Sequence, residues 1–226
     1  MNDKRKIIGT YYSKGSEDPH CFVWKEGSES KDSGLMEHGL ECRSAAINES
    51  AQITGAATTD GEQNWRAFLW QKSKFTDLGL LPGTLSSWGL ALNNTGTVVG
   101  AAELDFDHSR AFLWNGSMID LDQRGEYGSS AATAINDLGN IVGWALISGN
   151  QFSQAVRFAA SQVVSLSSEV SNIGNWILVS ATSINNGGMI VGNGYRGSGP
   201  GRPPRGGRAL KRGTAGRHGI LPAVTR

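Results

Sequence analysis

Hydrophobic residues along this chain come in short consecutive runs that recur at a nearly constant spacing. The phrase AINDLGNIVGWA begins at Ala134, and related phrases begin at Ala46, Ala91 and Ser183. Such self-similarity is the signature of a repeat architecture. The asparagine of the phrase recurs at steps of 45, 43 and 49 residues, at Asn48, Asn93, Asn136 and Asn185.

A second hydrophobic phrase recurs in step with the first. RAFLW occupies Arg66–Trp70 and Arg110–Trp114, with HCFVW at His20–Trp24 before them and QAVRF at Gln154–Phe158 after them. These phrases are separated by 46, 44 and 44 residues. Two independent phrases that recur together establish an internal repeat.

Each repeat predicts four short antiparallel strands. The residues before each asparagine are apolar and suited to a strand, and the IVG-type run after the turn is the returning strand. Asparagine bonds its own backbone at the first turn position, and glycine adopts positive φ at the fourth, as at Gly96 and Gly139. AFLW at 111–114 is the third strand, and the Asn115-Gly116 hairpin leads to the fourth.

The pattern within the strands predicts how the repeats assemble. AFLW and IVG are apolar at consecutive positions, which is typical of strands covered on both faces. Stacking successive sheets face to face provides this cover. We therefore expect an all-β fold, a β-propeller-like array of four-stranded antiparallel blades of about 44 residues. A β-solenoid is the alternative, although its coils are usually shorter.

The repeats define the domain organisation, and the array looks incomplete. In the first partial unit, IIGTYY, HCFVW and GLMEHG (34–39) are expected to supply strands two, three and four. The last partial unit has two strands. Residues 1–195 thus form the expected repeat domain, with a partial unit at 7–40, whole units at 44–79, 86–121 and 130–166, and a partial unit at 180–195.

Charge sets the last segment apart from the repeats. The chain has 226 residues and a formal net charge of +1, yet all 20 acidic residues lie before Arg196 and eight of the 21 basic residues lie at or after it. We expect 196–226 to be a disordered, basic Gly/Pro/Arg-rich tail. A nucleic-acid-binding arm is one interpretation. The break inside a repeat and the lack of aromatic residues after Tyr195 favour unselected or frame-shifted sequence, so no nucleic-acid partner is expected.

The phrases resemble the HAF repeats of bacterial extracellular proteins. That pattern runs approximately HAFLW, M-x-DLG-x-LGG and AIN-x-x-G-x-VVG, and the best match here is Arg66–Ala102. The resemblance covers most of 7–195. It implies a secreted or cell-surface setting, without catalytic residues. The sequence itself shows no signal peptide and no apolar run long enough to span a membrane.

Most of the distinctive residues are expected to be structural. We interpret the four turn asparagines as backbone-bonding residues, although they could also face a ligand. Trp24, Trp70 and Trp114 end equivalent strands, where packing between blades or a sugar platform are both possible, and packing is favoured. Tryptophans outside the repeat pattern are better candidates for a binding surface, among Trp65, Trp88, Trp144 and Trp176.

Metal and thiol chemistry have weak sequence support. Asp105, Asp107 and His108 have the oxygen-rich spacing of some calcium loops but lack the rest of a recognised loop. Solvated acidic loops are the commoner interpretation. Cys21 lies on an expected third strand and Cys42 just before the next first strand, so we expect two free thiols.

No catalytic motif appears in the sequence, and no cofactor is expected. The favoured function is a non-catalytic repeat scaffold or binding module whose loops meet a protein or a glycan, expected to be a monomer. The alternatives are a propeller enzyme that acts on polysaccharide, with carboxylates near a central channel, and a truncated fragment without independent function.

Overall fold

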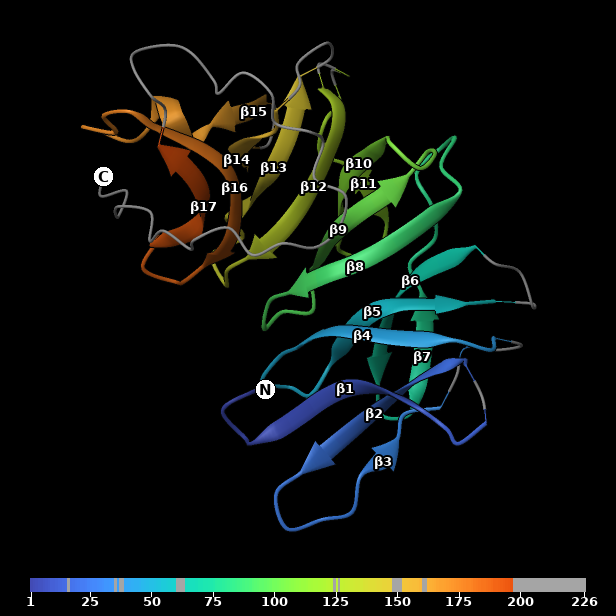
Figure 1. The fold of residues 1–226 in the computed structure, drawn as a ribbon. Helices are drawn as coiled ribbons and strands as arrows, with labels where there is room; N and C mark the ends of the chain where they lie inside the picture. The colour runs from blue at the N-terminus through green and yellow to red at the C-terminus, as the bar shows by residue number, and fades with distance from the viewer. Residues whose placement is uncertain are drawn as a thin grey trace.

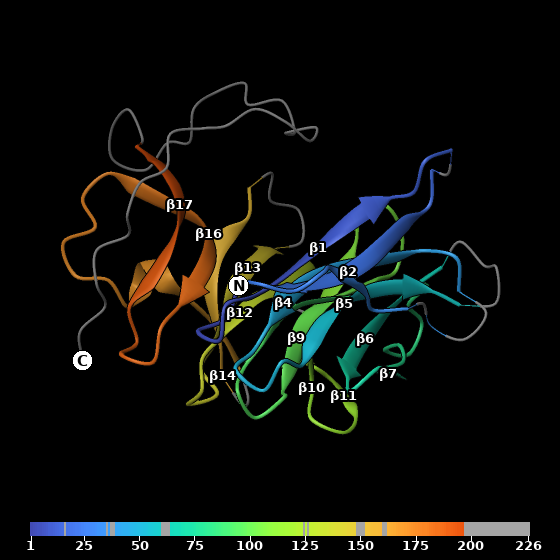
Figure 2. The same ribbon diagram turned by 90° about the horizontal axis from the view of Figure 1, so that it is seen from below.

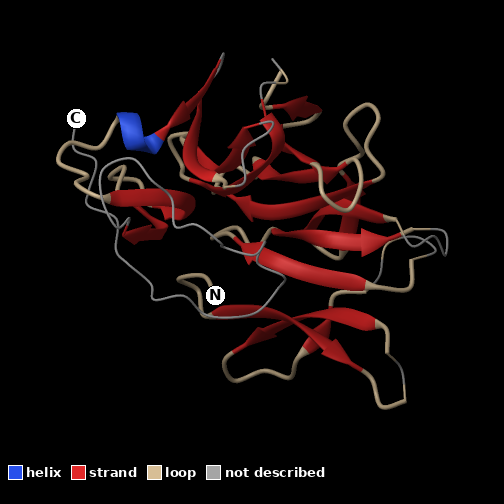
Figure 3. Cartoon of the chain, turned by 45° about the horizontal axis from the view of Figure 1, so that its top comes forward, coloured by secondary structure: helices blue, strands red, loops and turns tan. Residues whose placement is uncertain are grey.

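The computed structural model describes residues 1–196 except 16, 35, 37, 38, 60–63, 124, 126, 148–151, 160 and 161. The described chain is an all-β protein of antiparallel sheets (Figures 1 and 3). Its one helical element is the short 3₁₀ turn η1 (Leu166–Ser168). No helix in the described residues is long and apolar enough to cross a membrane. The expected tail lies outside the described residues except for Arg196, which ends the last strand.

The seventeen strands form five sheets, which we number in chain order. Sheet 1 contains β1 (Lys6–Tyr12), β2 (Pro19–Lys25) and β3 (Lys31–Asp32). Sheet 2 contains β4 (Cys42–Ile47), β5 (Ile53–Thr58), β6 (Trp65–Gln71) and β7 (Lys74–Asp77). Sheet 3 contains β8 (Ser86–Leu92), β9 (Val98–Glu103), β10 (Ser109–Trp114) and β11 (Met118–Asp120). Sheet 4 contains β12 (Tyr127–Ile135), β13 (Ile141–Ile147), β14 (Gln154–Ala159) and β15 (Gln162–Ser165), and sheet 5 contains β16 (Trp176–Ile184) and β17 (Ile190–Arg196).

The four-stranded antiparallel unit expected from the repeat is confirmed in sheets 2, 3 and 4. In each of them the strands pair in chain order, as a meander. In sheet 1, β1, β2 and β3 correspond to the second, third and fourth strands of a unit. The fourth strand was expected within 34–39, and the structure has it at Lys31–Asp32 instead. The reason is a turn after the aspartate, in which Gly34 N–H donates to Asp32 Oδ1 at 2.7 Å. Gly79 N–H makes the same contact with Asp77 at 2.8 Å.

Every first strand carries a one-residue bulge near its middle. The register shifts between Ser44 and Ala46 in β4, and equivalent shifts occur in β8, β12 and β16. A bulge bends a strand and brings its backbone toward the neighbouring strand. A Cβ atom at Gly55 or Gly143 of the second strand would overlap a first-strand carbonyl oxygen. The repeated VVG-type glycine therefore leaves room for this bulge.

Successive sheets stack on one another from sheet 1 to sheet 5 (Figures 1 and 2). The main contacts between neighbouring sheets are made by the first strand of the later sheet, so β8 packs on β4, β5 and β6. Four apolar clusters fill the four intervals between the sheets. Phe68 and Phe112, from the AFLW phrases, are fully buried in them. Apolar cover on both faces thus explains the consecutive apolar residues in the inner strands.

Candidate functional site

The turn asparagines form a continuous ladder of hydrogen bonds across the five sheets. Asn48 Nδ2 donates to the carbonyl oxygen of Asn93 at 3.0 Å, and Asn93 Nδ2 donates to that of Asn136 at 3.3 Å. Asn136 Nδ2 then donates to Asn185 O at 3.0 Å. Each Oδ1 atom meanwhile accepts backbone N–H groups within its own turn, as Asn136 does from Leu138 and Asn140. These residues thus bind turn to turn as well as shaping each turn.

The ladder begins at Asn2, which the sequence analysis missed. Asn2 Nδ2 donates to Asn48 O at 2.9 Å, and its Oδ1 accepts the N–H of Lys6 at 3.0 Å. The signal was present, because Asn2 precedes Asn48 by 46 residues and is followed by the run IIG. It was obscured because Arg5 occupies the glycine position of the turn, with φ of 57°.

The residue after each asparagine forms a second ladder beside the first. The N–H of Asp3 donates to Glu49 Oε1 at 2.8 Å, and the N–H of Glu49 donates to Asn94 Oδ1 at 3.0 Å. Asn94 N–H bonds Asp137, and Asp137 N–H bonds Asn186. The N–H of Asn94 and the amide of Asn186 lower the pKa of the Asp137 carboxyl. This end of the sheets is therefore held together by polar contacts between turns.

The fourth turn position has the positive φ expected from the turn. Gly96 and Gly139 have φ of 84° and 80°, in the region where glycine is favoured. Ala51 adopts a φ of 58° at the same position, although it has a side chain.

The three repeat tryptophans are half-buried, and two of them pack against the apolar clusters. Trp70 packs on the cluster between sheets 1 and 2, and its Nε1–H donates to Ser33 O at 3.0 Å. Trp114 packs on the cluster between sheets 2 and 3. Trp24, at the end of β2, pairs with Ile7 of β1. Packing between sheets accounts for the position of Trp70 and Trp114.

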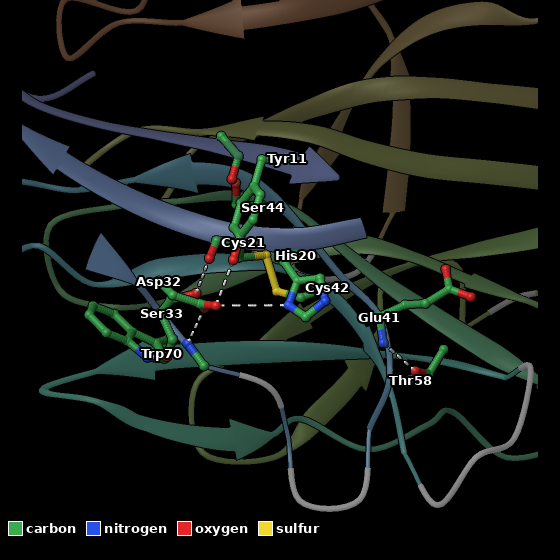
Figure 4. The surroundings of a disulfide bond; sticks show 12 residues. Tyr11, His20, Cys21, Asp32, Ser33, Glu41, Cys42, Ser44, Thr58 and Trp70 are labelled. Atoms are coloured by element: carbon green, nitrogen blue, oxygen red, sulfur yellow. Dashed lines mark hydrogen bonds and ion pairs between the residues drawn. A yellow bond between two sulfur atoms is a disulfide. The ribbon is translucent and has the colours of Figure 1, made fainter. Parts of the chain in front are cut away.

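Cys21 and Cys42 form a disulfide, so the expectation of free thiols is wrong (Figure 4). Their Cα atoms are 5.3 Å apart, and both residues are buried. The two strands are not neighbours within a sheet, and this misled the sequence interpretation. The first strand of a later sheet packs across the strand of the preceding sheet that carries the AFLW-type phrase. In sheet 1 that strand is β2, so β4 brings Cys42 against Cys21.

The disulfide replaces a hydrogen bond that recurs in the later sheets. Aligned by repeat, Cys21 corresponds to Ala67 and Ala111, and Cys42 to Ser87 and Ser130. The N–H of Ala67 donates to Ser87 Oγ at 2.9 Å, and that of Ala111 donates to Ser130 Oγ at 3.0 Å. One contact between neighbouring sheets is thus covalent in the first interval and polar in the next two.

Tyr11, His20 and Asp32 meet beside the disulfide (Figure 4). Tyr11 Oη donates to Asp32 Oδ2 at 2.8 Å, and this bond raises the pKa of the Tyr11 phenol. His20 Nδ1 lies 3.8 Å from Asp32 Oδ2, an ion-pair separation that is too long for a hydrogen bond. The cluster joins β1, β2 and β3 of sheet 1.

The loop predicted as a weak metal candidate brings two of its three residues together. His108 Nδ1 lies 2.8 Å from Asp105 Oδ1, and Asp107 contributes its backbone N–H to Asp105 at 2.9 Å. That N–H and the His108 ring lower the pKa of Asp105. Within the described part of the chain, no group of three His, Cys, Asp or Glu residues is placed to hold a metal ion.

Two of the tryptophans outside the repeat pattern form an aromatic cluster with an arginine. Trp65 and Trp88 stack with ring centroids 4.8 Å apart and planes inclined by 26°. The Arg43 guanidinium lies over the Trp65 ring, 5.1 Å from its centroid. Both rings are half-buried and Arg43 is exposed. Trp88 Nε1 is buried without a hydrogen-bond partner in the structure. We call these three residues the Trp65–Trp88 cluster.

The candidate residues separate by the end of the sheets at which they lie. Antiparallel meanders place the asparagine turns at one end and the loops between strands two and three at the other. Asp105 and His108 belong to the second end, and the Trp65–Trp88 cluster lies near it, because Arg43 and Trp65 stand at the matching ends of β4 and β6. Trp144 and Trp176 lie on β13 and β16, outside the cluster.

In comparisons with known proteins, no family model and no curated protein match this chain.

Proposed function

We propose that this chain is a non-catalytic binding module of a bacterial secreted or cell-surface protein, built as a β-propeller-like array of HAF repeats. The repeated four-stranded sheets and their stacking support the architecture. The Cys21–Cys42 disulfide is compatible with an oxidising, extracellular compartment. The partner is a protein or a glycan.

We assign different roles to the two ends of the sheets. The asparagine ladders fix neighbouring sheets to one another at one end, and the disulfide fixes sheet 1 to sheet 2 nearer the other end. That other end also carries the Trp65–Trp88 cluster, whose residues do not recur in the other repeats. Recognition residues on loops held by a rigid scaffold are the common arrangement in binding proteins.

The observation that carries the proposal is the Trp65–Trp88 cluster. Arg43 and Trp88 hold the same position in successive repeats, where the later repeats have Ala131 and Ser180, and Trp65 aligns with Pro19 and Ser109. Tryptophan and arginine are the residue types that contribute most to binding energy at interfaces. Trp88 also has an indole Nε1–H that is buried and unpaired in the structure.

The proposal is tested by screening the protein against a glycan array and a set of purified surface proteins. Ligands that bind should lose at least tenfold in affinity with Trp65→Ala or Trp88→Ala. The matched control is Trp176→Ala, because Trp176 is 44% exposed and lies in sheet 5, away from the cluster. Thermal unfolding of each variant separates loss of binding from loss of fold. Ligands that bind both cluster variants normally would contradict the assignment.

A further inference from the structure

The exposed apolar side chains gather at the end of the sheets opposite the asparagine turns, which we call the loop end. Nine large apolar side chains are exposed in the described residues. Three of them lie in or beside the asparagine turns. The other six lie at the loop end: Tyr12, Leu40, Leu85, Phe106, Ile147 and Trp176. A concentration of exposed apolar residues at one place on a protein marks an interaction surface.

Phe106 is the most exposed of these residues, and an ordered loop presents it. It lies between β9 and β10 and has a relative exposure of 110%. The N–H of Leu104 donates to His108 O at 2.9 Å, across the base of the loop. Asp105 Oδ1 accepts the N–H groups of Asp107 and His108 at 2.9 and 2.8 Å. Because these bonds fix the loop on both sides of Phe106, docking of this ring costs less entropy than docking of a ring on a loose loop.

Two carboxylates flank Phe106, and they differ in what they contact. The N–H of Asp107 and the ring of His108 lower the pKa of the Asp105 carboxyl, which is engaged within the loop. Asp107 is exposed, and its carboxylate forms no ion pair with any described residue. The loop therefore presents an aromatic ring beside an unpaired negative charge.

The Trp65–Trp88 cluster, near the same end, carries the opposite charge. Its Arg43 guanidinium lies over the Trp65 ring and has no acidic partner in the described part of the chain. Three other arginines are paired with carboxylates: Arg5, Arg110 and Arg157. A guanidinium that rests on a ring by its face keeps its N–H edges for a carboxylate. The cluster thus presents aromatic surface beside an unpaired positive charge.

One end of one chain therefore carries both halves of a complementary contact. Within the described chain no ion pair joins Arg43 to Asp107. A surface that holds both halves can meet a copy of itself about a twofold axis, and each contact is then made twice.

We propose that the loop end binds a second copy of this chain. The Phe106 ring of each copy packs on the Trp65–Trp88 cluster of the other, and each Asp107 carboxylate faces the Arg43 guanidinium. Aromatic residues supply most of the binding energy in such a contact, and the opposite charges fix its register. This inference rests on the proposed function, because it names the protein partner that the cluster binds. It replaces the expected monomer with a homotypic pair.

Sedimentation equilibrium of the full chain, over a wide range of protein concentration, tests the proposal. The wild type should show a reversible monomer–dimer equilibrium, and Phe106→Ala should weaken it at least tenfold. Leu138→Ala is the matched control, because Leu138 is 72% exposed but lies at the asparagine end, and it should dimerise like the wild type. Thermal unfolding checks that both variants keep their fold. A monomeric wild type, or a dimer that Phe106→Ala leaves unchanged, would overturn the proposal.

Exchange of the two charges tests the pairing itself. Asp107→Arg and Arg43→Asp should each weaken the dimer at least tenfold, because each places like charges opposite one another. The double variant restores opposite charges and should recover an affinity within about threefold of the wild type, as expected for residues in direct contact. A double variant as weak as the single variants would reject the contact between Arg43 and Asp107.

These results separate the homotypic pair from the binding module in general. A monomeric protein that binds a glycan or a surface protein through Trp65 would retain the proposed function and overturn the pairing. A dimer that requires Phe106 but is unaffected by Trp65→Ala would place the ring outside the cluster, and would also overturn it. A dimer weakened by both variants supports the pairing even when the screen finds no other ligand.

Discussion

At the scale of single residues, the turn asparagine does two jobs that few side chains can combine. Its Oδ1 atom accepts N–H groups of its own turn, and its Nδ2 group donates to the next turn. Aspartate would keep the acceptor but lose the donor, and serine is too short to reach both partners in the same way. This double role explains why the residue recurs at five turns.

The ladder predicts that an inner asparagine contributes more to stability than the last one. Asn136→Ala removes three hydrogen bonds at a buried position, and should lower the free energy of unfolding by about 2–3 kcal/mol. Asn185→Ala is the matched control, because Asn185 is exposed and its side chain is bonded to Met189 N–H alone among the described residues. It should cost about 1 kcal/mol or less. Urea unfolding measures both.

A third variant separates the two roles of the asparagine. Asn136→Asp retains an oxygen for Leu138 and Asn140 but removes the donor to Asn185. Its stability should lie between that of the wild type and that of Asn136→Ala. Equal stability of Asn136→Ala and Asn185→Ala would show that the contact between turns adds nothing.

At the scale of elements, the sequence was informative about strands and less so about the contacts between sheets. Two phrases recurring in step predicted the four-stranded meander, because hairpin turns and paired strands depend on residues close together in the chain. The Cys21–Cys42 bond and the asparagine ladder depend instead on how one sheet lies on the next. That arrangement requires the bulged first strand, whose position no local pattern revealed. The bulge is seen in the pairing register of the structure, and the glycine of the next strand makes room for it.

The correspondence between the disulfide and the Ala–Ser contact predicts a new crosslink. The double variant Ala67→Cys with Ser87→Cys should form a disulfide in oxidising buffer, because these positions repeat those of Cys21 and Cys42. A loop of this size should stabilise the protein by about 3 kcal/mol if the geometry is met. Peptide mapping under non-reducing conditions identifies the bond, and thermal unfolding measures its effect.

Register provides the control for this crosslink. Ser86 is adjacent to Ser87 in β8 but contacts Trp65 N–H rather than Ala67. Ala67→Cys with Ser86→Cys should therefore stay largely reduced under the same conditions. If both pairs crosslink equally, sheet 3 does not lie on sheet 2 in one fixed register.

At the scale of the whole molecule, the sheets of the described chain form a row, and the main contacts between sheets are made by neighbours. In such an array, stability is approximately the sum of the units and the interfaces between them. Sheets 1 and 5 have one neighbour each within the described chain, whereas sheets 2, 3 and 4 have two. The disulfide joins sheet 1 to sheet 2, and no such bond joins sheet 5 to sheet 4 in the described residues.

This arrangement predicts the order of local opening measured by hydrogen–deuterium exchange. β2 and β9 are central strands, each paired on both sides, whereas β17 pairs with β16 alone in the described residues. In the oxidised protein β9 should exchange most slowly, β2 somewhat faster, and β17 fastest, because within the described chain β17 has one paired strand and one neighbouring sheet. Reduction of Cys21–Cys42 should speed exchange in β2 while leaving β13 unchanged, since the lost bond touches only the interval between sheets 1 and 2. If reduction accelerates exchange equally in all sheets, the molecule opens as one cooperative unit, and the nearest-neighbour description fails.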